Sequence, residues 1–209
     1  SNNNDEVFFT VGVHPNEVLK DSNNSNYDLI HNISKKNKCV GIGECGLDYH
    51  YGKESINKQK NSFITQINVA RDIGLPLIIH SRDADEDMIK ILTSEYKKGS
   101  FKAILHCFSS GKKLALCGVE LGFYISFSGI VTFNSAKLIQ EVAMLVPKDK
   151  ILVETDAPYL SPTPLRGTIN EPKNCQITAK FLSDIRKIDF NKFVGQLNMN
   201  SYKIFDKMF

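Results

Sequence analysis

The sequence predicts a parallel α/β fold of the (β/α)8-barrel type, and three observations support this. Short runs rich in Val, Ile, Leu and Phe alternate along the 209 residues with segments of helical periodicity. The runs lack polar alternation, which is typical of strands that are buried on both faces. Each run also ends in a polar side chain. Strands that alternate with helices favour a parallel sheet, in which all strand ends lie at one edge.

Six runs are expected to be strands, at residues 7–13, 39–43, 75–79, 101–105, 122–127 and 150–155. Seven helices are expected between and after them, at residues 27–37, 55–73, 85–96, 112–121, 135–146, 172–188 and 191–208. Gly74 marks the end of the second helix, and Pro147 closes the fifth. We expect one domain over residues 1–209.

The polar side chains that end the runs are the main functional signal. They follow one another at intervals of 22 to 36 residues, one βα unit each: His14, Glu44, His80, His106, Ser128 and Asp156. A doubly wound sheet uses only the few strands beside its switch point. A barrel brings every strand end to one mouth, where its active site lies. Functional groups on every strand therefore favour the barrel.

Eight strands are needed to close such a barrel, and the sequence offers six. Two further βα units would take roughly 50–60 residues and would give the ~250 residues usual for the fold. We therefore expect that the first two units are absent from this chain, which starts with Ser1. A parallel sheet left open exposes its strand edges, which favours association into an oligomer.

Composition excludes several classes of protein. The chain is 42% hydrophobic and 23% charged, as globular domains are. Its five cysteines include no CxxC pair, which argues against a disulfide scaffold and favours a reducing, cytoplasmic compartment. No apolar run approaches the ~18 residues of a membrane span, so no membrane partner is expected. A net charge of +3 is too small to prove a nucleic-acid partner.

Five of the polar residues form a ligand set of nitrogen and oxygen atoms without thiolate: His14, Glu44, His80, His106 and Asp156. Such a set suits Zn²⁺, Mn²⁺, Mg²⁺ or Fe²⁺. A bound ion lowers the pKa of water, and a second ion about 3.5–4 Å away can clamp the attacked group and the leaving oxygen. The site fits hydrolysis of a phosphodiester or of a carbonyl compound, and the ligands alone do not choose between them.

Each of these residues also has a purely structural interpretation. His14 precedes Pro15 and fits a turn, and Asp156 fits the N-cap of a following turn. His80 and His106 end aliphatic runs, where a buried histidine with satisfied hydrogen bonds is common. The shared position after a strand favours the functional interpretation for all of them.

Several segments resemble the TatD-type metal-dependent deoxyribonucleases. These are VGVHP at 11–15, GIGECGLDY at 41–49, PLIIHSRDA at 76–84, ILHCFS at 104–109 and LVETDAPYL at 152–160. A later Arg166-Gly167 and Asn170-Glu171-Pro172 are similar to the loop after that family's last strand. The family's usual Asp-x-His-x-His motif is absent from this sequence, whose first recognisable segment corresponds to the family's third strand. The resemblance implies a TIM barrel of the metallo-hydrolase superfamily that holds Mg²⁺, Mn²⁺ or Zn²⁺, one or two ions.

The resemblance also implies roles for single residues. Glu44 would be a carboxylate shared between metals, and His80 and His106 would hold one ion. Asp156 would bind metal and take the proton of the attacking water, which makes Glu44 and Asp156 the expected catalytic pair. His14 would be a further ligand or a phosphate contact.

Three more residues are expected to bind substrate. Arg82 and Arg166 are candidates for contact with substrate phosphate. His50 lies just past a strand end and is a further candidate.

The leading functional hypothesis is a metal-dependent hydrolase that cleaves DNA phosphodiester bonds from the 3′ ends of single strands. A second hypothesis keeps the metal and changes the substrate to an ester or amide, such as an aminoacyl-tRNA. A third is a shortened remnant of the fold that binds metal or a partner without turnover.

Overall fold

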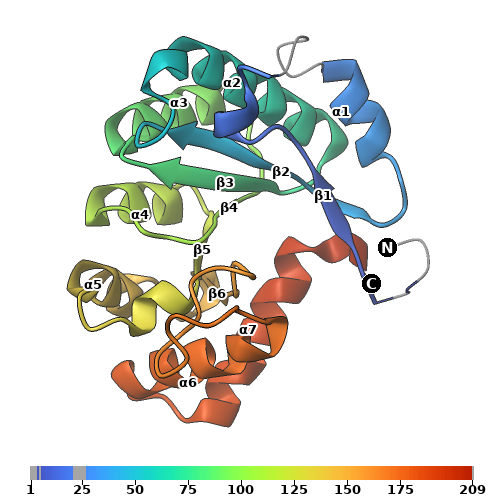
Figure 1. Ribbon diagram of the computed structural model, residues 1–209. Coiled ribbons are helices and arrows are strands. Elements are labelled where there is room, and N and C mark those ends of the chain that lie inside the picture. Colours follow the sequence, from blue (N-terminus) through green and yellow to red (C-terminus); the bar gives the residue numbers. More distant parts are fainter. Residues whose placement is uncertain (1–3, 5, 21–26, 209) are drawn as a thin grey trace. The chain divides into compact units, whose positions relative to one another are not determined.

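The computed structural model describes residue 4, residues 6–20 and residues 27–208 (Figure 1). These residues form two compact units. One comprises the described residues up to Ile104 together with those from Ile204, and the other is Leu105–Lys203. The order of the strands in the sheet is the same as their order along the chain. The pairs β1–β2, β2–β3 and β5–β6 are parallel. The predicted parallel α/β fold is confirmed.

All six expected strands are present: β1 (Phe9–Val11), β2 (Cys39–Asp48), β3 (Leu77–Arg82), β4 (Ala103–Leu105), β5 (Tyr124–Phe127) and β6 (Ile151–Val153). The expectation that each polar residue directly follows its strand is wrong for Glu44 and His80, which lie inside β2 and β3. It is also wrong for His14 and Asp156, because β1 ends at Val11 and β6 at Val153, three residues before them.

The reason is that β2 continues along β3 beyond Glu44. The pairing shifts register between Ile42 and Cys45 and then resumes, with Gly46 opposite His80. Gly46 has a φ of 140°, and a Cβ atom there would lie 2.0 Å from the carbonyl oxygen of His80. Only glycine allows this approach.

All seven expected helices are also present, with bounds that differ by a few residues: α1 (Tyr27–Ser34), α2 (Ile56–Ile73), α3 (Asp85–Lys98), α4 (Lys112–Glu120), α5 (Lys137–Leu145), α6 (Cys175–Ile185) and α7 (Phe190–Ile204). Helix α2 ends at Gly74, as expected, which adopts a φ of 74° and donates its N–H to the carbonyl of Ala70. Helix α6 begins later than expected because Pro172–Asn174 forms a 3₁₀ turn.

In the first unit, helix α2 packs on strand β2, and both can be followed in Figure 1. Phe63 and Ile67 of α2 are completely buried, as are Ile42 and Leu47 of β2. Burial of such side chains contributes roughly 1.5–3 kcal/mol each to folding, so this contact holds β2 in a fixed position.

In the second unit, helix α4 packs on strand β5. Gly118 lets the helix approach, because a Cβ atom there would lie 2.8 Å from the side chain of Leu105. Asn200 of α7 is fully buried, and its side chain donates to the carbonyls of Lys148 and Ile151 at the start of β6. These contacts fix the strands that precede His106 and Asp156.

None of the helices formed by the described residues is long and apolar enough to cross a membrane.

Candidate functional site

Each unit gathers one group of side chains that can hold a divalent ion. In the first unit the group is His14, Glu44 and His80, and in the second it is His106, Glu154 and Asp156. Within each group, one ligand atom per residue lies within 4.8 Å of the others. The five ligands predicted from the sequence all belong to these groups, and Glu154 is an addition.

His80 lies between two carboxylates in the first unit. Its Nδ1 atom is 2.9 Å from Oε1 of Glu44, and its Nε2 atom is 3.2 Å from Oδ2 of Asp48. The side chain of Asp48 is 1% exposed, whereas that of Glu44 is 35% exposed. Asp48 is therefore suited to orient the ring, and Glu44 to bind metal beside it.

Asp48 stays ionised because it is well supplied with donors. Burial by itself raises the pKa of this carboxyl, but hydrogen bonds from the N–H of Tyr51, the amide of Asn16 and the ring of His80 outweigh it, so the pKa lies below its usual range. Oδ1 accepts from the N–H groups of His50 and Tyr51, each at 2.9 Å. An ionised Asp48 draws the proton of His80 to Nε2 and leaves a lone pair on Nδ1.

His14 is placed differently from the other histidines. Its Nδ1 atom accepts the N–H of Asn16 at 3.1 Å, so the neutral ring carries its proton on Nε2. That atom lies 3.5 Å from Oε1 of Glu44. In this arrangement His14 is a hydrogen-bond donor to Glu44 or to a substrate oxygen, and it can bind metal through Nε2 only with the other tautomer.

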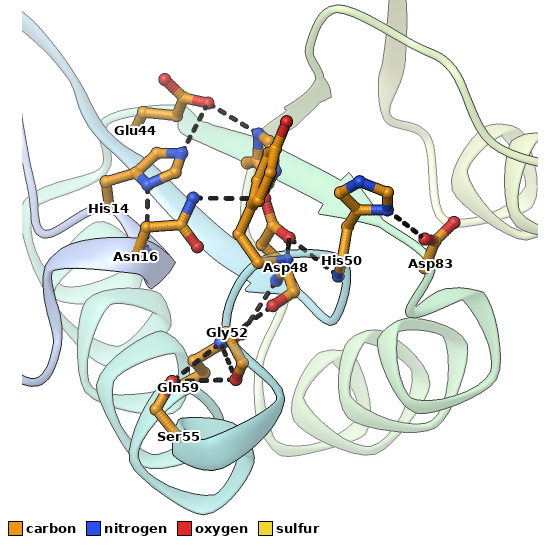
Figure 2. Close-up of polar contacts among 11 residues, drawn as sticks. His14, Asn16, Glu44, Asp48, His50, Gly52, Ser55, Gln59 and Asp83 are labelled. Carbon is orange, nitrogen blue, oxygen red and sulfur yellow. Dashed lines mark hydrogen bonds and ion pairs between the residues drawn. The ribbon is translucent and has the colours of Figure 1, made fainter.

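Two buried glutamines of helix α2 hold the segments that carry these residues. Gln66 accepts the N–H of Val13 and donates to the carbonyl of Val13, which fixes the residue before His14. One heptad earlier, Gln59 does the same for Asp48 and also donates to the carbonyl of Gly52 (Figure 2). Buried backbone groups need hydrogen-bond partners of this kind. The two glutamines, both on helix α2, therefore hold in place the segment before His14 and the segment that contains Asp48.

In the second unit, Glu154 holds His106. Its Oε1 atom is 2.9 Å from Nδ1 of His106, and its Oε2 atom accepts from Oγ of Ser126 at 2.7 Å. Desolvation raises the pKa of Glu154, but His106, Ser126 and the N–H of Cys107 outweigh it and hold the pKa below its usual range. The proton of His106 is then on Nδ1, and its Nε2 atom has the lone pair for a metal beside Asp156.

Two residues at this group adopt left-handed backbone conformations. Cys107 has a φ of 43° and Asp156 a φ of 53°, which costs about 1–3 kcal/mol each for a residue with a Cβ atom. Asn170 offsets part of this cost, because its amide donates to the carbonyls of Thr155 and Tyr159 on either side of Asp156. Backbone strain held in place by buried hydrogen bonds is frequent at functional sites.

The donor sets fit a divalent ion. Nδ1 of His80 and Oε1 of Glu44 both present lone pairs, and two such atoms 2.9 Å apart repel each other unless a cation or proton lies between them. Neighbouring ligands of an octahedral ion with bonds of about 2.1 Å are roughly 3 Å apart. Among the described residues nothing donates to the buried Oδ1 atom of Asn16, so this atom can accept from a metal-bound water.

The residues predicted to bind substrate lie in two places. His50 and Arg82 belong to the first unit, where Nδ1 of His50 is 3.0 Å from Oδ2 of Asp83. Arg166 belongs to the second unit, and its guanidinium lies over the ring of Phe133 at 4.5 Å. Their contact with a substrate stays a prediction.

Comparison with known proteins gives the family. Residues 1–206 match the family model described as TatD related DNase. The chain belongs to the TatD-related DNase family. It is 36% identical over 201 residues to the metal-dependent hydrolase YabD of Bacillus subtilis (strain 168), an alignment that covers 96% of this chain and 78% of YabD. To the metal-dependent hydrolase YcfH of Escherichia coli (strain K12) it is 37% identical over 203 residues, which cover 96% of this chain and 74% of YcfH.

Solved structures agree with this assignment. YJJV, a TatD homologue from Escherichia coli K12, superposes with a TM-score of 0.90 at 25% identity, over 98% of this chain and 79% of YJJV. A TatD-family hydrolase from Entamoeba histolytica gives a TM-score of 0.80 at 24% identity, over 95% of this chain and 74% of that one. The expected TatD-type barrel fold is therefore confirmed.

Family membership identifies this TatD protein as a metal-dependent hydrolase, and the two groups are the residues of the described chain that can hold the metal. Sequence reasoning missed Asp48 and Glu154, the carboxylates that orient the histidines. Both lie in segments that carry the family resemblance, Asp48 four residues after Glu44 and Glu154 two residues before Asp156, but no periodicity in the sequence distinguishes them.

Proposed function

We propose that this TatD protein is a divalent-metal-dependent deoxyribonuclease that removes nucleotides from the 3′ ends of single-stranded DNA. The observation that carries the proposal is the presence of two histidine–carboxylate groups in a chain that matches the TatD-related DNase family. Phosphodiester hydrolysis needs an activated water and stabilisation of the charge on the phosphate, and both groups have the donor chemistry for this.

A divalent ion, when bound, supplies a Lewis acid and a water of lowered pKa. In the first unit Glu44 and His80 would hold it, while Asp48 keeps the proton of His80 on Nε2. In the second unit His106 and Asp156 would hold it, and the Asp156 carboxylate would accept the proton of the attacking water.

Arginine and histidine side chains would help to stabilise the charge on the phosphate. Arg82 and Arg166 would pair with phosphate oxygens of the strand, since a guanidinium matches two phosphate oxygens at once. His14, with its proton on Nε2, would donate a hydrogen bond to a phosphate oxygen. The strand itself is bound mainly through its phosphates, so affinity is expected to fall steeply with salt.

The direct test uses 5′-labelled single-stranded DNA with Mg²⁺ or Mn²⁺. We expect a ladder of shortened products that EDTA abolishes and that a 3′-terminal phosphorothioate linkage delays. Asp156→Ala should lower the rate at least about 100-fold, because it removes a proton acceptor and a ligand. The exposed Asp28 of helix α1 offers a matched control, and Asp28→Asn should leave the rate unchanged.

Two results would contradict the proposal. One is wild-type protein without metal-dependent product, and the other is Asp156→Ala with full activity. If the protein instead releases the amino acid from aminoacyl-tRNA in a metal-dependent reaction and leaves DNA intact, the ester-hydrolase hypothesis replaces the nuclease.

A further inference from the structure

We propose that Tyr51 is a stacking platform for a base of single-stranded DNA, with Arg82 beside it as the contact for a backbone phosphate. This inference rests on the proposed function, because it names the part of the strand that this surface would take. Tyr51 lies outside the segments that carry the family resemblance, the nearest of which ends at Tyr49.

Tyr51 presents a large ring on a fixed backbone. The residue is 65% exposed, which by itself is common for a surface aromatic. Its N–H, however, donates at 2.9 Å to Oδ1 of Asp48, and the N–H of His50 does the same. Because Asp48 is buried and accepts both of these N–H groups, the turn that carries the ring is held in one conformation. A platform that is already ordered loses little entropy when a base stacks on it.

The neighbours of the ring have the chemistry of a nucleotide site. The guanidinium carbon of Arg82 lies 4.7 Å from the centre of the Tyr51 ring. The ring of His50 meets Tyr51 edge-on, with its centre 4.6 Å away. Proteins commonly bind single-stranded nucleic acids with aromatic rings that lie next to guanidinium groups. The rings stack on the bases, and the guanidinium groups pair with the phosphates that connect the nucleotides.

Charge favours Arg82 over His50 as the phosphate contact. Nδ1 of His50 pairs with the exposed carboxylate of Asp83 at 3.0 Å, and this carboxylate repels a phosphate there. Arg82 is held over an uncharged ring, and its guanidinium can pair with a phosphate without leaving the ring.

One side chain links this platform to the metal-binding group. Oδ1 of Asp48 holds the turn that carries Tyr51, and Oδ2 of the same carboxylate lies 3.2 Å from Nε2 of His80. In the paired strands β2 and β3, Asp48 is also directly opposite Arg82. A base on Tyr51 would therefore keep a fixed position relative to His80, which is what aligning a strand for cleavage requires.

The experiment compares two fluorescein-labelled oligomers of equal length on the full chain, with Ca²⁺ in place of Mg²⁺. One is oligothymidylate, and the other has the same phosphates with abasic sugars. Tyr51→Ala should weaken binding of oligothymidylate about tenfold, the size expected for one stacked base. Binding of the abasic oligomer should not change. Tyr51→Phe keeps the ring and should bind both oligomers as the wild type does, and so should Tyr202→Ala, which removes an exposed tyrosine of helix α7.

A second readout reports stacking itself. The chain has no tryptophan, so 2-aminopurine in the oligomer can be excited selectively. Wild type and Tyr51→Phe should quench its emission, and Tyr51→Ala should not. Equal binding and quenching by wild type and Tyr51→Ala would overturn the inference while leaving the nuclease intact. Equal weakening of both oligomers by Tyr51→Ala would overturn it too, because the turn rather than the ring would then be responsible. If wild type neither binds nor cleaves oligothymidylate, the proposed function fails, and this inference fails with it.

Discussion

Asp48 in one unit and Glu154 in the other stand in the same relation to a histidine. Each accepts a hydrogen bond from one ring nitrogen, at 3.2 Å for Asp48 and 2.9 Å for Glu154. Each is itself held by further donors, which keep its pKa low. The carboxylates thereby decide which nitrogen of His80 and of His106 has the lone pair for a metal.

Asp48→Asn tests this relation at one atom. The amide removes the negative charge and can donate toward His80, which favours the wrong tautomer. We expect the affinity of the first unit's group for Mn²⁺ or Zn²⁺ to fall about 10–100-fold, measured by competition with a chromogenic chelator. Asp28→Asn should have no effect. Unchanged affinity in Asp48→Asn would show that His80 does not depend on this carboxylate.

The ligands were visible in the sequence because a charged or imidazole side chain stands out after an aliphatic run. The orienting carboxylates were not, because nothing local shows that Asp48 meets a histidine of another strand. The left-handed conformations of Cys107 and Asp156 were also invisible. Neither residue is glycine, and only the surrounding hydrogen bonds explain why they adopt this conformation.

At the scale of elements, strand β2 decides where Glu44 and Asp48 lie. It was predicted to end at residue 43, because the apolar run is interrupted there by Glu44. In the structure Gly43 and Gly46 permit close contact with β3 instead: a Cβ atom at Gly43 would lie 2.6 Å from the carbonyl oxygen of Ile78. Glycine in a strand thus marks a close approach of backbones here, and not an end.

Gly46→Ala tests that close approach. The new Cβ atom would collide with the carbonyl of His80, and the φ of 140° is unfavourable for alanine. We expect the free energy of unfolding to fall by roughly 3 kcal/mol or more, measured by urea denaturation. Gly195→Ala is the control, since its Cβ atom meets open space inside helix α7. It should stabilise by about 0.5–1 kcal/mol. An equal effect of both changes would contradict the account of β2.

Helix α2 shows another limit of sequence reasoning. The helical spacing of its apolar residues predicted the helix, and the structure shows that it packs on β2. Gln59 and Gln66 lie on the buried face of the helix and are both fully buried. An argument from hydrophobic periodicity expects apolar residues at these positions and does not explain the two glutamines. Their role appears only when the backbone groups of Asp48 and Val13 are seen to need partners.

A polar contact between elements gives a pH-dependent prediction. Asp87 of α3 accepts from Nζ of Lys60 on α2 at 2.7 Å and from the hydroxyl of Tyr49 at 2.8 Å. These two donors hold the pKa of Asp87 below its usual range. Its stabilising effect is therefore complete above pH ~4, the pKa of an unfolded aspartate, and is lost as pH falls through the lowered native pKa.

Asp87→Asn should accordingly cost about 1 kcal/mol of unfolding free energy at pH 7 and progressively less below pH 4. Urea denaturation of both proteins at pH 7 and pH 3 checks this. A difference that stays constant with pH would mean that the charge of Asp87 does not contribute.

At the scale of the whole molecule, the alternation of strands and helices along the sequence was enough to predict the parallel fold, whereas the family was recognised from five sequence segments. The alternation of apolar strand segments and helical segments tolerates changes in single residues, because it depends on the burial of whole strands on both faces. The division of the described residues into two compact units was not predicted. The boundary lies near Ile104 and Leu105, in an apolar run that looks like every other strand. That the chain forms a single domain stays a prediction.

Metal binding by both units is the central claim, and ion stoichiometry tests it most directly. Metal-free protein is dialysed against Mn²⁺ or Zn²⁺, and the bound ions are counted by mass spectrometry alongside thermal unfolding. We predict that wild type binds metal in both units and that each bound ion adds about 2.7 kcal/mol of stability at a free concentration of 100 times its Kd. The double variants Glu44→Ala/His80→Ala and His106→Ala/Asp156→Ala should each stay folded and bind fewer ions. Wild type that binds no metal, or either variant that retains the full complement of ions, would contradict the account.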